Sequence, residues 1–270
     1  MEQITDIQAA AERALSCCNP TEKVALTQEL AQMVMAAQLA FVHTRAFQLF
    51  EQPGRPDRPE LVPPAKLEQR KLGSVQGRAA LIHAVAHIEF NAINLAWDAI
   101  YRFANMPQRY YTDWASVALD EARHFALLAT RLAQLGYEYG DFPAHNGLWD
   151  TACATRDDVL ERMALVPRML EARGLDVTPG MIQRLRSVGD FETAGILAVI
   201  LDEEVRHVAI GSFWFAELCA QRGLIPEDCF IALLKKRGTW PRPPFNAPAR
   251  LSAGFTASEL KILEQLARAS

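Results

Sequence analysis

Apolar residues recur along most of the chain at intervals of three and four positions, and no segment shows the alternation of apolar and polar residues that is typical of strands. An interval of three or four places side chains on one face of a helix. The pattern therefore predicts an all-α protein. The helices that we expect cover residues 3–17, 21–49, 75–104, 107–135, 157–173, 179–187, 191–221 and 257–268.

Proline and glycine mark the predicted breaks in the first half of the chain. Asn19-Pro20 separates the first two helices, and five of the fifteen prolines lie in residues 52–64, where no helix can persist. The turn at Asn105-Met106-Pro107 makes the next two helices an α-hairpin, which Gly136 ends. Residues 137–155 are too rich in glycine, proline and aromatic residues for a tight turn, so we expect an irregular crossover there.

In the second half of the chain, we expect a kinked helix, a short helix and then a long one. Pro167 lies inside the predicted helix 157–173 and indicates a kink, and Gly174 is its expected C-terminal cap. Residues 179–187 then form a short helix before the long one at 191–221. Residues 240–248 predict an irregular strap.

Composition narrows the class of protein. The 270 residues contain 28 Lys and Arg against 32 Asp and Glu, a net charge of −4, which disfavours binding to nucleic acid or to an anionic membrane. No apolar run approaches the roughly 18 residues of a membrane span, and the N-terminus has no signal-peptide pattern. The five cysteines fit neither a disulfide framework nor a C-x-x-C metal site. We expect a cytoplasmic protein with reduced thiols that binds neither nucleic acid nor membrane.

Two predicted helices carry the same short motif. Asp120-Glu121-Ala122-Arg123-His124 and Glu203-Glu204-Val205-Arg206-His207 both contain an acid, a Glu, any residue, an Arg and a His. Because a Glu and a His three apart on a helix project in similar directions one turn apart, they can bind one ion. Their neighbours on the helix are apolar. Burying an unpaired carboxylate among them costs on the order of several kcal/mol of desolvation free energy unless a cation compensates its charge. The repeat therefore predicts a metal hook on each helix.

A dimetal site in a four-helix bundle also needs a single Glu from each of two further helices. Glu89 is the candidate on the first hairpin, because residue 105 in the turn is the midpoint between Glu89 and Glu121. Antiparallel helices then place the two carboxylates at the same height.

The fourth carboxylate is less clear from spacing. Glu171 precedes Glu204 by nearly the same interval, but the expected helix end at Gly174 removes the simple turn between them. Glu161 and Glu192 are the alternatives.

Five segments of the chain resemble the bacterial ferritin-like family called domain of unknown function 455. They are Arg78–Glu89, Asp120–His124, Tyr139–Trp149, Leu170–Gly180 and Glu203–His207. The resemblance covers about residues 54–255 and extends more distantly to the tRNA-hydroxylating diiron enzymes. It implies a ferritin-like four-helix core with accessory helices, and the segment Leu170–Gly180 favours Glu171 over its alternatives.

The resemblance and the helix pattern together predict three parts within one structural domain. Residues 1–64 form N-terminal helices and a Pro-rich connector that pack on the bundle. Residues 65–225 form the ferritin-like dimetal four-helix bundle, and residues 226–270 form a C-terminal strap with a short helix.

The predicted ligand set suits iron or manganese better than zinc, because it mixes carboxylates with imidazoles. Its members are Glu89, Glu121, His124, Glu171, Glu204 and His207. We expect two iron ions, with manganese as the alternative, since four carboxylates balance the charge of two Fe(II). We interpret His83 and His87 as structural, and His145 as either packing or lying beside the substrate.

The expected function is that of an O2-dependent oxidoreductase or oxygenase. It would act on a small organic substrate, take electrons from an external donor and form a homodimer. Two other classes are the alternatives. One is a ferroxidase or iron-handling protein with the same ligands, and the other is a metal-free helical interaction module in which Glu121 and Glu204 pair with Arg123 and Arg206.

Overall fold

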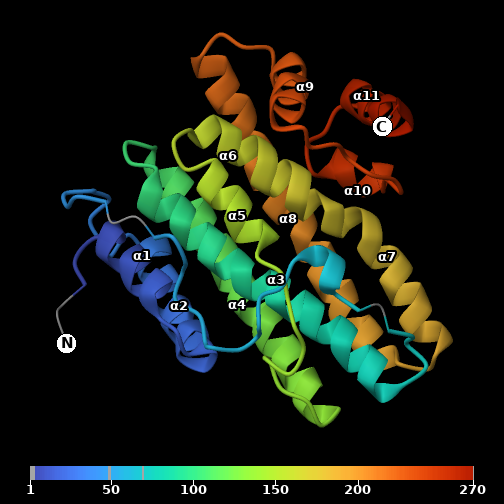
Figure 1. The fold of residues 1–270 in the computed structure, drawn as a ribbon. Helices are drawn as coiled ribbons and strands as arrows, with labels where there is room; N and C mark the ends of the chain where they lie inside the picture. Colours follow the sequence, from blue (N-terminus) through green and yellow to red (C-terminus); the bar gives the residue numbers. More distant parts are fainter. Residues whose placement is uncertain (1–3, 48–49, 69, 270) are drawn as a thin grey trace. The chain divides into compact units, whose positions relative to one another are not determined.

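The computed structural model describes residues 4–47, 50–68 and 70–269. Within these ranges the regular secondary structure is helical and the only β features are isolated bridges, which confirms the all-α prediction (Figure 1). The chain divides into two compact units, residues Met1–Cys153 and Ala154–Ser270. Each is described by itself below. The expected division into residues 1–64, 65–225 and 226–270 stays a prediction.

The first unit is built on an α-hairpin that two N-terminal helices cover. α3 runs antiparallel to α4, α1 packs on α3, and α2 packs on α4 (Figure 1). Every residue of α3 from Glu89 to Tyr101 is buried. The helices of this unit are α1 (Ile7–Ser16), α2 (Pro20–Met35), the short 3-10 helix η1 (Pro64–Lys66), α3 (Val75–Arg102), α4 (Gln108–Gln134) and α5 (Gly147–Ala154), whose last residue already belongs to the second unit.

Local signals set the ends of the central hairpin. The Ser74 side chain caps α3 by accepting a hydrogen bond of 3.0 Å from the Gly77 N–H. Pro107 immediately precedes α4, and Gly136 follows its end with a φ of +80°, a conformation that glycine adopts without a steric penalty. The hairpin therefore lies within two residues of the predicted boundaries.

The second unit also contains an α-hairpin. α7 and α8 pack against each other, and Asp190 caps α8 by accepting a hydrogen bond of 3.0 Å from the Thr193 N–H. The helices are α6 (Val159–Leu165), the π-helix η2 (Val166–Glu171), α7 (Ala172–Ser187), α8 (Phe191–Gln221), α9 (Pro226–Arg237), α10 (Ala247–Ser252) and α11 (Ala257–Ala269).

The prediction of a helix end at Gly174 was wrong. Gly174 and Pro179 both lie inside α7, so the predicted helices 157–173 and 179–187 join in a continuous helical segment of α6, η2 and α7 that ends at Ser187. An interior glycine costs only about 1 kcal/mol and an interior proline about 3 kcal/mol. The continuous buried face of α7, which includes Leu175, Ile182 and Leu185, offsets these costs.

Pro167 lies in the π-helix η2, and the kink predicted at this residue stays a prediction. Proline lacks an N–H and crowds the preceding turn, and a wider turn relieves both problems. Pro167 also packs against Gly211 of α8, where a Cβ atom would overlap the proline ring.

The arginine side chain of the π-helix anchors the C-terminal helices in the second unit. The Arg168 guanidinium lies 4.5–4.7 Å from the ring centres of Phe215, Phe230 and Phe255. Its Nη2 donates to Glu259 Oε1 at 2.6 Å. Arg168 therefore ties α8, α9 and α11 to η2, although the sequence predicted only a strap and one short helix after residue 225.

The predicted helix 21–49 was too long. α2 ends at Met35 because Ala37 adopts a left-handed φ of 53°, and Ala40 then pairs with Asp6 in an isolated parallel bridge. Residues 48–49, like residue 3 of the first predicted helix, lie outside the described residues. The predicted irregular crossover 137–155 holds only to residue 146, because α5 follows it.

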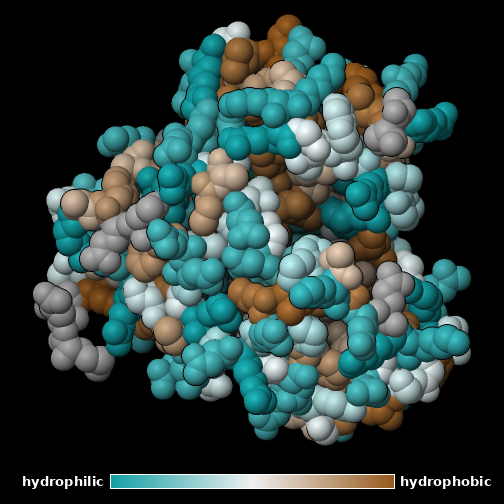
Figure 2. Space-filling view, viewed as in Figure 1, coloured by the Kyte–Doolittle hydropathy of each residue, from teal (hydrophilic) through white to brown (hydrophobic). Residues whose placement is uncertain are grey.

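α3 has the length and hydropathy of a membrane span, but 72% of its most apolar window is buried within the structure. A core helix of a soluble protein has this property. The face drawn in Figure 2 carries mainly hydrophilic side chains with smaller apolar patches between them. Both observations indicate a soluble protein.

Candidate metal centre

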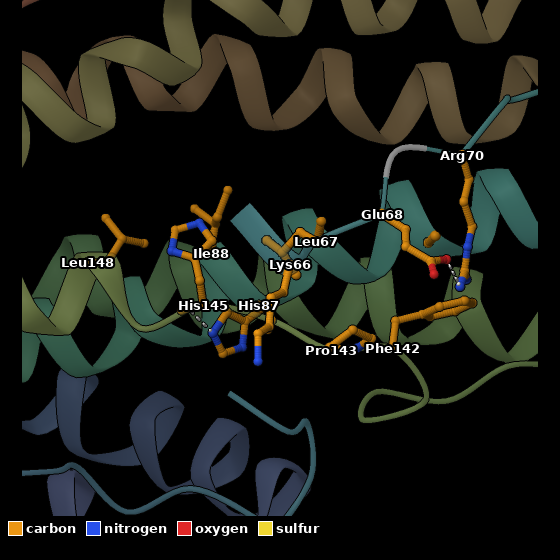
Figure 3. A pocket seen from close by; sticks show the side chains of 13 residues that line it. Lys66, Leu67, Glu68, Arg70, His87, Ile88, Phe142, Pro143, His145 and Leu148 are labelled. Carbon is orange, nitrogen blue, oxygen red and sulfur yellow. Dashed lines mark hydrogen bonds and ion pairs between the residues drawn. The ribbon is translucent and has the colours of Figure 1, made fainter. Parts of the chain in front are cut away.

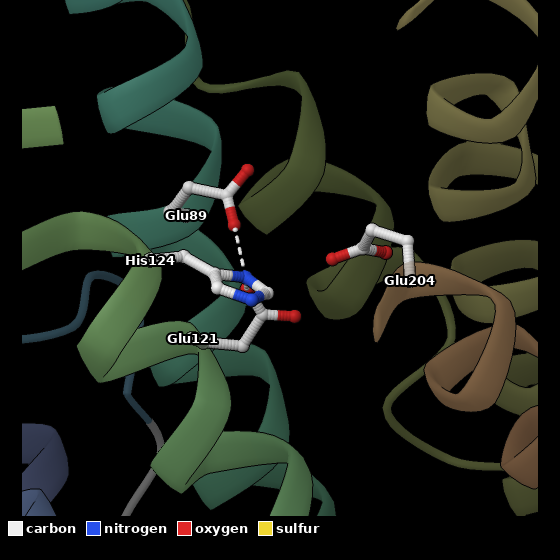
Figure 4. Close-up of side chains that lie close together, drawn as sticks. All are labelled: Glu89, Glu121, His124 and Glu204. Atoms are coloured by element: carbon white, nitrogen blue, oxygen red, sulfur yellow. Dashed lines mark hydrogen bonds and ion pairs between the residues drawn. The ribbon is translucent and has the colours of Figure 1, made fainter. Parts of the chain in front are cut away.

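Three of the six predicted ligands come together inside the first unit. Glu89 lies thirteen residues before the end of α3 at Arg102, and Glu121 lies thirteen residues after the start of α4 at Gln108. The two carboxylates therefore lie at one height in the hairpin, with His124 one turn further along α4 (Figure 4). Each of the three side chains offers a ligand atom, and these atoms lie within 4.8 Å of one another.

His124 lies between the two carboxylates. Its Nδ1 is 3.0 Å from Glu89 Oε2 and 3.4 Å from Glu121 Oε2. Glu121 and His124 are fully buried, and Glu89 is 4% exposed. Burial alone would lower the pKa of His124, but the hydrogen bonds and charges of Glu121 and Glu89 raise it to about 11. Without a metal, the imidazole is thus protonated and supplies the positive charge that the buried carboxylates require.

The second unit carries the other copy of the motif on α8. His207 Nδ1 lies 3.2 Å from Glu204 Oε1, and the His207 side chain is fully buried while 12% of the Glu204 side chain is exposed. Glu204, which Figure 4 also labels, lies thirteen residues after the start of α8 at Phe191. This is the position that Glu121 has in α4.

Glu171 occupies the corresponding place on the other arm of this hairpin. It is the last residue of η2 and lies sixteen residues before the end of α7 at Ser187. The mismatch with Glu204 is three residues, or about 4.5 Å of helix rise, which is comparable to the length of a glutamate side chain. Because the helix that follows Glu171 is continuous, without the predicted break at Gly174, the turn near residue 188 sets the heights of Glu171 and Glu204.

The two alternatives to Glu171 have other environments. Glu161 on α6 forms ion pairs with Lys236 and Arg237 of α9. Glu192 is exposed in the first turn of α8, twelve residues or about 18 Å along the helix from Glu204. These placements favour Glu171 as the third-helix carboxylate. The complete six-residue dimetal site stays a prediction.

The arginines of the two motifs were the basis of the metal-free alternative. Arg123 donates to Asp120 Oδ1 at 3.1 Å on its own helix, and this ion pair lies in part at the surface. The acid before the Glu in the first motif therefore binds the arginine of the same motif. The i,i+3 separation of Asp120 and Arg123 explains this pairing, because residues three apart are neighbours on a helix surface.

His83 and His87 hold the crossover segment against α3. The Tyr139 hydroxyl donates to His87 Nδ1 at 2.9 Å, His87 Nε2 donates to the His145 carbonyl at 3.1 Å, and the Gly140 N–H donates to His83 Nε2 at 2.9 Å. Burial lowers the pKa of both histidines to about 4, so both are neutral. These contacts agree with the structural interpretation of the two histidines, which stays a prediction. Nothing in the sequence indicated that Tyr139 would contact His87.

Comparison with known proteins identifies the family. Residues 16–261 match the family described as "Protein of unknown function (DUF455)". The chain belongs to the DUF455 family. The match begins earlier than the resemblance at residues 54–255, so it also includes α2. An "Uncharacterized protein" of Haemophilus influenzae (strain ATCC 51907 / DSM 11121 / KW20 / Rd) is 42% identical over 269 residues, which cover 95% of this DUF455 chain and 93% of that protein. No solved structure matches the chain.

Proposed function

We propose that this DUF455 protein is a non-haem dimetal carboxylate enzyme, an O2-dependent oxidoreductase or oxygenase of a small organic substrate. The observation that carries the proposal is the buried group of Glu89, Glu121 and His124 in the first unit. The hairpin of the second unit repeats the pattern with Glu171, Glu204 and His207. Iron is the proposed metal, and manganese is the alternative.

The donor set fits a divalent ion of this kind. Glu89 and Glu121 bring two negative charges into a buried place, and the imidazolium of His124 balances one of them. A divalent ion can replace that proton and supply one further positive charge. Two carboxylate oxygens and one imidazole nitrogen are ligands that iron and manganese accept, whereas structural zinc sites commonly include thiolates.

Each side chain has a proposed role. Glu89, Glu121 and His124 would hold one ion, and Glu171, Glu204 and His207 would hold the other. When bound, two iron ions supply the ability to bind and reduce O2 with electrons from an external donor. The residues around these side chains hold them in place and exclude water from the site. In the first unit, Phe90 and Phe125 follow Glu89 and His124 in sequence, and their rings pack 5.3 Å apart.

Anaerobic loading with Fe(II), followed by exposure to O2 in an oxygen electrode, tests the proposal. We expect O2 uptake in proportion to the bound iron, and we expect Glu121→Ala to abolish it. Asp120→Ala is the matched control, because it removes the neighbouring carboxylate, which pairs with Arg123 at the surface, and it should retain uptake. Iron that binds without consuming O2 would contradict the enzymatic part of the proposal.

The same preparation separates the competing classes. A ferroxidase or iron-handling protein would take up O2 but would accumulate ferric iron far beyond two ions per chain and would assemble into a cage of high native mass. A metal-free interaction module would bind no iron. The proposed enzyme would behave as a soluble cytoplasmic homodimer that depends on an added reductant for turnover.

A further inference from the structure

A cavity of about 420 Å³ lies in the first unit, on a face of α3 that the metal ligands do not use. Its volume falls in the range of small-molecule sites, about 300–1,000 Å³. Ala80, Ala84 and Ile88 form one wall, at intervals of four residues along α3. Residues from two other segments form the remaining walls: Lys66, Leu67, Glu68 and Arg70 from one, and Phe142, Pro143, Ala144, His145 and Leu148 from the other. The cavity is therefore a groove between α3, the chain from the end of η1 onward and the crossover that leads into α5, and we call it the α3 groove.

The walls of the α3 groove are mostly apolar and partly exposed. Leu67, Phe142, Pro143 and Leu148 line it together with the α3 residues. The Ile88 side chain is 45% exposed, which is unusual for a large aliphatic residue in the middle of a buried helix. An apolar ligand of matching length would cover this surface, so the burial of apolar area would favour its binding.

Charged groups in the groove favour an anion. Arg70 is neutralised, because its Nη2 lies 2.9 Å from Glu68 Oε2 and its guanidinium lies 5.1 Å from the Phe142 ring centre. Among the residues that the structure describes, no carboxylate pairs with Lys66. Figure 3 shows Arg70 and Phe142 at one end of the groove, His145 and Leu148 at the other, and Lys66 between them.

His145 offers a second donor. The Gly147 N–H donates to His145 Nδ1 at 3.1 Å, so the ring carries its proton on Nε2. No other hydrogen bond of this ring occurs within the described residues. The Nε2–H can therefore donate to an oxygen of a ligand in the groove.

Hydrogen bonds hold the walls in place before any ligand binds. The His145 carbonyl accepts from His87 on α3, and the Ala144 carbonyl accepts from the Val62 N–H at 2.8 Å. The Ala144 N–H in turn donates to the Glu60 carbonyl at 3.0 Å. A preformed site of this kind loses little conformational freedom when it binds a ligand.

We propose that the α3 groove binds a medium-chain monocarboxylate, with its hydrocarbon chain along Ala80, Ala84 and Ile88 and its carboxylate at Lys66 and His145. This inference goes beyond the proposed function, because it requires no metal and assigns no reaction.

Isothermal titration calorimetry of the full chain in its metal-free form tests the assignment. Octanoate is the probe, and octan-1-ol and octylammonium have the same chain length with no charge and the opposite charge. We expect octanoate to bind about five-fold more tightly than octan-1-ol, the effect of one partly exposed ion pair, and octylammonium to bind most weakly. Equal affinity for octanoate and octan-1-ol, or no binding of octanoate, would overturn the proposal.

Two pairs of variants locate the binding. Ala84→Trp fills the groove and should abolish octanoate binding, whereas Ala133→Trp, at an exposed position near the end of α4, should not. Lys66→Gln should weaken octanoate binding about three- to five-fold and leave octan-1-ol unaffected. Lys71→Gln removes the same charge outside the groove and should change neither.

The charge variants decide the question even if Ala84→Trp does not fold. Unchanged octanoate affinity in Lys66→Gln would contradict the proposal. Glu121→Ala, which removes a proposed metal ligand, should bind octanoate as the wild type does. A failure of the metal proposal and a failure of the groove proposal are thus distinguishable.

Discussion

Lys23 on α2 gives a prediction whose size follows from its surroundings. Its side chain is fully buried, its Nζ donates to Asn94 Oδ1, and the ammonium lies 5.3 Å from the Phe90 ring centre. Burial lowers the pKa of Lys23 from 10.5 to about 7, although the nearby Cys17 and Cys18 oppose this shift. The folded protein thus favours the neutral amine, while the unfolded chain keeps the ammonium up to about pH 10.

The lowered pKa makes stability depend on pH. Between about pH 7 and 10.5 the unfolded state binds more protons than the folded state, so the free energy of unfolding rises with pH. With these two pKa values, Lys23 contributes a rise of about 2 kcal/mol between pH 7 and pH 9. Below about pH 6 the contribution is constant, because the amine is then protonated in both states.

Lys23→Met tests this reasoning, because it removes the titrating group and keeps an apolar chain of similar length. Urea unfolding of wild type and variant at pH 7, 8 and 9 gives the free energy of unfolding at each pH. The difference between the two proteins should change by about 2 kcal/mol in favour of the wild type across this interval. The lost hydrogen bond to Asn94 shifts the whole curve but not its slope. Parallel pH profiles would refute the assignment of the lowered pKa to Lys23.

Three further predictions concern the hairpins. Binding of the first divalent ion to the metal-free protein at pH 7 should release about one proton from His124, whose pKa is about 11. Calorimetry in buffers of different ionisation enthalpy measures the number of protons released. A binding enthalpy that does not depend on the buffer would contradict a protonated His124. Gly211→Ala should lower the free energy of unfolding by about 1–3 kcal/mol, because the new Cβ atom would overlap Pro167. Gly195→Ala on the same helix places its Cβ atom in open space and should leave the stability unchanged or raise it. Equal urea midpoints for the two variants would argue against the Pro167 contact. Elemental analysis should find less metal in Glu171→Ala than in the wild type. Glu161→Ala removes the partner of Lys236 and Arg237 and should keep the wild-type metal content. The opposite result would make Glu161 the ligand.

The sequence predicted the hairpin of α3 and α4 closely because its signals are local. Ser74 and Gly136 act on the residues beside them, and Pro107 is adjacent to the first turn of α4. The same local reasoning failed at Gly174 and Pro179, because the buried face of α7 outweighs their intrinsic helix penalties. Ala37 has no preference for its left-handed φ, so nothing in the sequence could indicate the end of α2.

Some residues of the candidate sites could likewise be predicted from the sequence, and others could not. Glu89, Glu121 and His124 could be predicted together, because helix periodicity and the midpoint of the turn determine their heights. Lys66 and His145 could not be brought together from sequence. Lys66 ends the short helix η1 and His145 lies in the crossover. The chain segments around them meet through the bridge between Leu61 and Ala144, and no periodic pattern encodes that contact.

The metal content of the purified chain tests the central claim most directly. After anaerobic loading with Fe(II) or Mn(II) and removal of the free ions, elemental analysis should find close to two ions per wild-type chain. Glu121→Ala and Glu204→Ala should each reduce this number, and the double variant should retain almost none. A wild-type chain that binds neither metal, or a double variant whose metal content equals that of the wild type, would contradict the dimetal account.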